Sequence, residues 1–134
     1  MNPVILEHFN SIEEHLLQSQ FVVSYKILRQ EVAYTGGKLR VKVNFAGGSV
    51  AELFEYVTIS DEILCLSKYS FHWQDDQGKL KCRWDNAPHH PDLPNAPHHR
   101  HNADESVNGI LQPTDMLNIL KEMEQAFISE PDRK

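Results

Sequence analysis

The sequence predicts an α+β domain, in which a mostly antiparallel sheet of five strands carries an N-terminal and a C-terminal helix on one face. Three observations support this prediction. Apolar residues recur at helical spacing near both ends of the chain, they alternate with polar residues in the middle, and short turns rich in glycine or aspartate separate the alternating segments. Because 134 residues lie within the usual size of one folding unit, we expect residues 1–134 to form a single domain.

The first expected element is a helix over residues 3–18. Asn2 is a favourable N-cap, and Pro3 suits the first helical position because its missing N–H would have no partner there. The apolar stripe consists of Ile5, Phe9, Ile12 and Leu16. Their four-three-four spacing places them on one side of the helix, which we expect to pack on the sheet.

The middle of the chain predicts strands at about residues 21–32, 38–45, 49–59, 64–74 and 79–86. The second strand has the clearest pattern, because apolar side chains alternate with charged or polar ones from Lys38 to Phe45. The third is the weakest, since its residues also fit a helical turn. The face away from the helices is expected to carry Lys38, Arg40, Lys42, Lys68, His72, Lys81 and Arg83.

The fourth and fifth strands are predicted to form a hairpin around the turn at residues 75–78. If Asp75 is opposite Gly78, then Gln74 is opposite Lys79, and every later pair follows from this register. One face would then hold Tyr69, Phe71, Trp73, Leu80, Cys82 and Trp84. The other face would hold Lys68, Ser70, His72, Lys81, Arg83 and Asp85. A slip of one residue would mix these two sets, so the pattern favours this pairing.

A long loop over residues 87–112 and a final helix over residues 113–129 complete the expected order. The word NAPHH occurs twice, at residues 86–90 and 95–99, and the loop holds five of the eight histidines of the chain. A loop of this length in a compact domain is usually functional or disordered, and its prolines favour an ordered one. These five histidines are His89, His90, His98, His99 and His101.

Composition and charge narrow the classes of function. The net charge of −6 disfavours nucleic acid as a partner for the chain as a whole, but nine of its thirteen Lys and Arg residues lie between Lys26 and Arg83. The two cysteines form no disulfide framework or zinc-ribbon pattern. A basic signal-peptide region and an apolar run of membrane-spanning length are both missing from the sequence. We therefore expect a cytoplasmic protein that does not enter a membrane.

The histidine-rich loop allows three interpretations, of which the first is metal binding. Zinc sites use three or four ligands at short spacing, and the candidate ligands are His89, His90, His99 and His101. Adjacent histidines rarely bind one ion together, and no thiolate or HExxH pattern accompanies them. We therefore expect no cofactor, and zinc is kept as the alternative.

The second interpretation is proton transfer in a metal-independent ribonuclease. Such an enzyme needs one group to activate the 2′-hydroxyl, a second to protonate the leaving oxygen, and a cation near the phosphate. The polar face of the hairpin offers His72 with Lys81 and Arg83, and Asp85 at the end of the strand. The loop could bring one of its histidines to this face, namely His89, His90, His98, His99 or His101. Tyr69 and Trp84 could stack on bases if their rings are accessible.

The third interpretation is a non-enzymatic binding module with a partner-binding loop. A bare sheet face or an edge strand is a surface to which another chain can add, and a second copy of this chain is one such partner. Neutralisation of a partner protein through the acidic ends of the chain is disfavoured, because small acidic proteins with that role often have a disordered half and this sequence predicts folded structure throughout.

One segment resembles a known family. Residues 68–101 contain the run Tyr-Ser-Phe-His-Trp-Gln starting at Tyr69, the run Arg-Trp-Asp-Asn starting at Arg83, and two Pro-His-His units that end in His101. In these motifs the chain resembles the TumE-like toxin family of bacterial toxin–antitoxin systems, and residues 49–57 and both helical ends extend the similarity. The resemblance implies a toxin with a cognate antitoxin as its partner. Ribonuclease activity is then an analogy with other small toxins of such systems, and RNA is the substrate this analogy implies.

Overall fold

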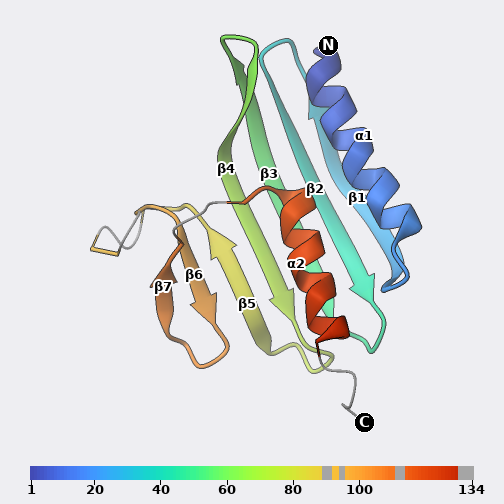
Figure 1. The fold of residues 1–134 in the computed structure, drawn as a ribbon, viewed down its shortest axis with the longest axis vertical. Helices are drawn as coiled ribbons and strands as arrows, with labels where there is room; N and C mark the ends of the chain where they lie inside the picture. Colours follow the sequence, from blue (N-terminus) through green and yellow to red (C-terminus); the bar gives the residue numbers. More distant parts are fainter. Residues whose placement is uncertain (89–91, 94–95, 111–113, 130–134) are drawn as a thin grey trace.

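The computed structural model describes residues 1–88, 92–93, 96–110 and 114–129. In chain order, its elements are α1 (Pro3–Gln18), β1 (Val22–Val32), β2 (Gly36–Phe45), β3 (Val50–Ser60), β4 (Ile63–Gln74), β5 (Leu80–Asp85), β6 (His99–Asn102), β7 (Val107–Gly109) and α2 (Met116–Ile128). The strands form one antiparallel sheet, ordered as they are in the sequence. Both helices lie on the same face of this sheet, α1 along β1 and β2 and α2 across its middle (Figure 1).

The predicted α+β class, the two helices and the antiparallel sheet are confirmed, but the predicted number of strands is wrong. Over the residues that the structure describes, the sheet has seven strands, because the expected loop at residues 87–112 contains β6 and β7. These two strands have four and three residues and a largely polar sequence, so they carry no apolar alternation. They exist because β6 pairs with the edge of β5 and β7 pairs with β6, which is a tertiary cause.

The two helices differ in how closely they follow their predicted bounds. α1 runs from Pro3 to Gln18 as predicted, and Oδ1 of Asn2 accepts the N–H group of Val4 at 2.8 Å. α2 begins at Met116 rather than at residue 113, which is outside the described residues. The side chain of Asp115 is its N-cap and accepts the N–H group of Asn118 at 3.0 Å. An aspartate at the N-cap satisfies a backbone donor that the helix itself cannot pair.

One continuous core lies between the helices and the sheet. It buries the α1 stripe, the apolar side of β2, and the α2 residues Met116, Ile119, Leu120 and Met123. Gly37 shows how closely α1 approaches β2, since a Cβ atom at this position would lie 2.6 Å from Cγ2 of Ile5. Burial of one such aliphatic side chain stabilises the fold by about 1.5–3 kcal/mol. The apolar faces therefore dictate which side of the sheet is covered, and the charged faces are left to water.

The β4–β5 hairpin differs from the predicted register by two residues. Phe71 is opposite Trp84, and Trp73 is opposite Cys82. The turn is closed by the N–H group of Asp75, which donates to the carbonyl oxygen of Lys79 at 2.8 Å, and a bulge follows. A shift of two residues keeps the predicted faces, because side chains alternate with a period of two.

The bulge moves Lys81 to the face opposite from the one predicted. In the register, Gln74 pairs with Leu80 and Trp73 pairs with Cys82, so Lys81 is the extra residue between two pairs. A bulged residue leaves the regular alternation of its strand. The Nζ atom of Lys81 lies 4.9 Å from the ring centroid of Trp73, on the side covered by the helices.

Candidate functional site

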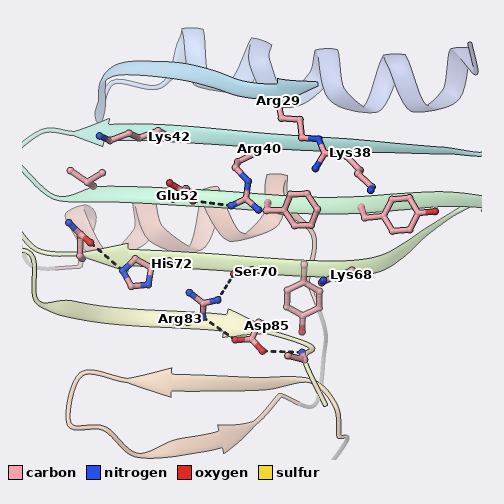
Figure 2. A pocket seen from close by; sticks show the side chains of 16 residues that line it. Arg29, Lys38, Arg40, Lys42, Glu52, Lys68, Ser70, His72, Arg83 and Asp85 are labelled. Atoms are coloured by element: carbon pink, nitrogen blue, oxygen red, sulfur yellow. Dashed lines mark hydrogen bonds and ion pairs between the residues drawn. The ribbon is translucent and has the colours of Figure 1, made fainter. Parts of the chain in front are cut away.

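The face of the sheet away from the helices is hollowed into a groove of about 1040 Å³. We call it the basic groove. Its cationic lining residues are Arg29, Lys38, Arg40, Lys42, Lys68 and Arg83, and among the described residues its acidic ones are Glu52 and Asp85. Figure 2 shows these side chains, which project from the five strands β1, β2, β3, β4 and β5. The alternation of charged residues along β2 predicted this side for Lys38, Arg40 and Lys42.

The two acidic lining residues are each paired with an arginine. Nη1 of Arg40 donates to Glu52 at 2.9 Å, and Nε of Arg83 donates to Oδ2 of Asp85 at 3.1 Å. Within the described part of the chain, no carboxylate forms an ion pair with Lys42 or Lys68. The groove therefore keeps unneutralised positive charge, although the net charge of the chain is negative.

Three polar residues form a row across neighbouring strands, of which His72 and Arg83 line the groove and His101 lies beside it. His72 on β4 is the cross-strand partner of Arg83 on β5, and Arg83 is the partner of His101 on β6. Neighbouring strands lie about 4.8 Å apart, so the two histidines flank the arginine on one face of the sheet. We call these three residues the histidine–arginine row. Figure 2 shows the His72 and Arg83 part of this row.

Arg83 is held in place from two sides. Its Nη2 atom donates to Oγ of Ser70 at 2.8 Å, and its Nε atom donates to Asp85. His72 is less fully satisfied, because its Nε2 atom lies 3.3 Å from Oε1 of Gln74 and its buried Nδ1 atom has no hydrogen-bond partner among the described residues. A buried polar atom without a partner costs about 1–3 kcal/mol, so it calls for an explanation such as a catalytic role, an ordered water molecule or an ion.

Asp85, His99 and His101 form a compact cluster beside the row, which we call the Asp85 cluster. The Asp85 residue is 5% exposed, and His99 is fully buried. Oδ1 of Asp85 lies 2.9 Å from Nε2 of His99 and accepts the N–H group of Ala87 at 3.0 Å. Oδ2 lies 3.7 Å from Nε2 of His101. The two imidazole rings meet edge to face, with their centroids 4.9 Å apart.

The predicted histidines thus separate into three groups. His99 and His101 lie in the Asp85 cluster, and His89 and His90 lie outside the described residues. His98 points elsewhere, with its Nδ1 atom 3.0 Å from the hydroxyl oxygen of Tyr69. Burial, and then the charge of His99, lower the pKa of His98. A neutral His98 can accept a hydrogen bond at Nδ1 from the hydroxyl group of Tyr69, whose own pKa is raised to about 12 by burial and by Asp85.

Three predicted site residues lie on the helix-covered side of the sheet, namely Tyr69, Trp84 and Lys81. Tyr69 and Trp84 are 1% and 4% exposed, so their rings have no face available for a base. Their apolar rings lie in the helix-covered core, which is the face predicted for them. Rings buried there cannot stack on the bases of RNA. Lys81 lies over Trp73 on that same side, away from His72 and Arg83.

The sequence did not single out Ser70, Gln74 or the pairing of Asp85 with His99. Ser70 could have been found, because it alternates onto the same face as His72. The position of His99 opposite Asp85 depends on the pairing of β6 with β5, which no local pattern indicates. The ligand atoms of the Asp85 cluster lie within 4.8 Å of one another, so these three residues could hold a metal ion. Two of the four predicted zinc ligands therefore belong to this cluster.

A comparison with models of known protein families gives a match over most of the chain. The model of a family described as Toxin TumE matches residues 12–130, which include every strand of the sheet and the whole of α2. The searches of curated proteins and of solved structures gave no significant match. Among the described residues, no helix is long and apolar enough to cross a membrane.

Proposed function

The chain belongs to the TumE toxin family, and from this premise we propose that it is the toxin of a bacterial toxin–antitoxin module and that it cleaves RNA in the basic groove. The proposed chemistry is acid–base catalysis by histidine without a metal ion. The observation that carries the proposal is the histidine–arginine row, in which His72 and His101 flank Arg83 on one face of the sheet and His72 and Arg83 line the groove of positive charge.

RNA binding is supported by the charge of the groove. Both acidic side chains in the described lining are already paired with arginines, so a phosphate backbone would meet mainly free cations such as Lys42 and Lys68. Phosphate contacts contribute most of the affinity in such complexes and make it dependent on salt. The negative net charge does not oppose this, because electrostatic attraction follows the local potential and not the sum over the chain.

The chemistry follows from the order of side chains in the row. One imidazole accepts the proton of a ribose 2′-hydroxyl as its oxygen bonds to the adjacent phosphorus, and the other, protonated, gives its proton to the departing 5′-oxygen. The bond between phosphorus and that 5′-oxygen breaks, which leaves a 2′,3′-cyclic phosphate and a 5′-hydroxyl. Arg83 lies between the two imidazoles, where it can neutralise the charge that develops on the phosphate. Asp85 and Ser70 act as positioning residues for Arg83.

The partner proposed for this toxin is a cognate antitoxin in the cytoplasm. An acidic segment of the antitoxin would complement the basic groove and exclude RNA from it. The outer edge of β1 gives a second contact, because an end strand can pair with a strand of the antitoxin or of a second copy of this chain.

The test combines toxicity with RNA cleavage. Wild-type protein expressed without its neighbouring gene product should stop growth, and purified protein should cleave RNA in the presence of EDTA. His72→Gln and His101→Gln should each lower cleavage by about 10²–10⁴-fold and relieve toxicity. His98→Gln is the matched control, because its ring faces Tyr69 and not the groove. It should stay active.

Three outcomes would contradict parts of the proposal. Harmless expression of the wild-type chain would remove the toxin function. Cleavage by both variants would show that the row is not the site. Toxicity without cleavage would favour the alternative, a non-enzymatic binding module that acts through a metal- or partner-binding loop.

A further inference from the structure

The Asp85 cluster has a feature that acid–base catalysis does not use. The buried Nδ1 atom of His99 lies 2.8 Å from the carbonyl oxygen of Pro97. A carbonyl oxygen can only accept a hydrogen bond, so the proton of this imidazole is on Nδ1. The lone pair of Nε2 then points toward Oδ1 of Asp85, which lies 2.9 Å away.

Two lone pairs at this distance repel each other unless a cation lies between them. That cation can be a proton or a metal ion. In metal sites, a histidine ligand almost always donates its second ring N–H to a carbonyl or carboxylate group, which fixes the tautomer and aims the other nitrogen at the ion. The contact between His99 and Pro97 has this arrangement.

We propose that Asp85, His99 and His101 bind a divalent transition-metal ion of the zinc class. Two imidazoles and one carboxylate are ligands that suit zinc. At metal–ligand distances of about 2.0–2.1 Å, tetrahedral ligands lie about 3.3 Å apart. Oδ1 of Asp85 lies 2.9 Å from Nε2 of His99, and one ligand atom from each of the three residues lies within 4.8 Å of the other two, so the side chains need to shift only slightly to share one ion.

The surroundings orient the carboxylate for this role. The N–H group of Ala87 donates to Oδ1, and Nε of Arg83 donates to Oδ2, so Asp85 is held from both sides. The positive charge of Arg83 opposes a cation, but its contact with Oδ2 leaves Oδ1 and the two imidazoles to face the ion. Three protein ligands leave one coordination position of zinc open. Because Asp85 lines the basic groove, we place this open position at the groove.

The inference concerns binding and does not rest on ribonuclease activity. It has one consequence for the proposed function, because an imidazole bound to a metal cannot accept or donate a proton at the same nitrogen. Zinc bound to His101 would therefore inhibit cleavage that depends on the histidine–arginine row.

The site is tested by titrating the full chain, prepared without a histidine tag or a nickel column, with Co²⁺ and then displacing the cobalt with Zn²⁺. The visible absorption of cobalt reports coordination by the protein. We expect one ion per chain with a Kd of about 1 μM or tighter. Asp85→Asn, His99→Gln and His101→Gln should each weaken binding by at least about tenfold. His98→Gln should not, since its ring contacts Tyr69.

A second control addresses the rest of the histidine repeat. The double variant His89→Gln/His90→Gln should keep the site intact. The proposal is overturned if the double variant abolishes binding while the three cluster variants do not, or if wild-type protein binds no more tightly than about 1 mM. If the His99 variant fails to fold, His101→Gln decides the result, because this side chain is 30% exposed and tolerates substitution.

Activity measurements separate this proposal from the preceding one. If zinc binds and inhibits cleavage, the result supports both the metal site and metal-independent cleavage of RNA. Binding of zinc by a chain that does not cleave RNA supports the metal site alone. Cleavage that EDTA abolishes and zinc restores would support the site and overturn metal-independent catalysis.

Discussion

Glu55 and Asp85 are both buried carboxylates that meet histidines, but they lie on opposite faces of one sheet. Glu55 on β3 is fully buried beneath the helices. Its Oε1 atom lies 2.6 Å from Nε2 of His8 on α1, and its Oε2 atom accepts the N–H group of Met116 at 3.0 Å. One side chain therefore connects the sheet to both helices.

Asp85 uses similar chemistry for a different purpose. Its partners Arg83 and His101 have side chains that are 40% and 30% exposed, so they connect the buried carboxylate to solvent, and Arg83 lines the basic groove. Both oxygens of Glu55 are saturated by groups that stay inside the fold. A buried carboxylate thus stabilises the fold when all its partners are internal, and it positions a site when some of its partners face water.

Removal of Glu55 should have the largest effect on stability. Glu55→Ala leaves His8 and the first N–H group of α2 without their acceptor, and we expect the free energy of unfolding to fall by about 3 kcal/mol. Glu52→Ala is the matched control on the same strand, since Glu52 faces the groove and its ion pair with Arg40 is half exposed. That variant should lose at most about 1 kcal/mol. Equal losses in urea unfolding would refute the distinction between the two faces.

Replacement of Asp85 should lower the free energy of unfolding less than replacement of Glu55 does. It should lower the catalytic activity more. Asp85→Asn keeps an acceptor for the N–H group of Ala87, and Arg83 and His101 can be hydrated, so we expect a loss of about 1–2 kcal/mol. Because Asp85 positions Arg83, kcat for RNA cleavage should fall while KM changes little. If the folded variant kept an unchanged kcat, Asp85 would not be a positioning residue of the site.

The pairing of His8 with Glu55 should make stability depend on pH. Burial alone lowers the pKa of His8, but the hydrogen bond and the charge of Glu55, with the charge of Asp115, outweigh it and raise the pKa above its usual 6.5. The folded state therefore binds the extra proton more tightly than the unfolded state. This stabilisation is fully present below about pH 6.5, and it is lost as the pH rises through the folded-state value.

The test is to measure the urea concentration at the midpoint of unfolding at several pH values between about 6 and 9. His8→Gln should flatten the decline over this range. A slope that stays unchanged in the variant would mean that another group causes it. His98 should have the opposite effect on stability, because its pKa is lowered in the folded state. Its contribution to the free energy of unfolding is therefore lost as the pH falls.

The smallest expected effect concerns individual lysines of the groove. Lys42→Gln and Lys68→Gln should each weaken RNA binding modestly, because each removes about one phosphate contact. The slope of log K against log salt should fall by about 0.7 per contact for single-stranded RNA. Lys121→Gln on the exposed side of α2 is the control, and it should leave the slope unchanged. A loss of slope in the control would show that RNA does not use the groove.

The elements differ in how well the sequence predicted them. α1 and β2 have strong periodic patterns, and both were predicted with the correct buried side. β3 was ambiguous alone, and its pairing with β2 and β4 makes it a strand. The β4–β5 register was wrong by two residues because a bulge follows the turn, and a bulge has no clear pattern in one strand.

The candidate site shows the same division. The charges of the groove follow from alternation along β2 and β4, so Arg40, Lys42 and His72 were placed on the right face. The position of Lys81 was not predictable, because the bulge reverses its side. The meeting of His99 with Asp85 was missed, since these residues are far apart in the sequence and come together only when β6 adds to β5.

By itself, the sequence determined which faces are apolar, and therefore that two helices cover one side of a sheet and leave a basic side exposed. Periodicity carries this information locally, because each side chain is set by its neighbours one to four residues away. Only the tertiary structure decided that β6 and β7 exist and that two histidines converge on Asp85. Those outcomes depend on pairing between distant segments, and the short polar strands that form the pairs carry no periodic pattern.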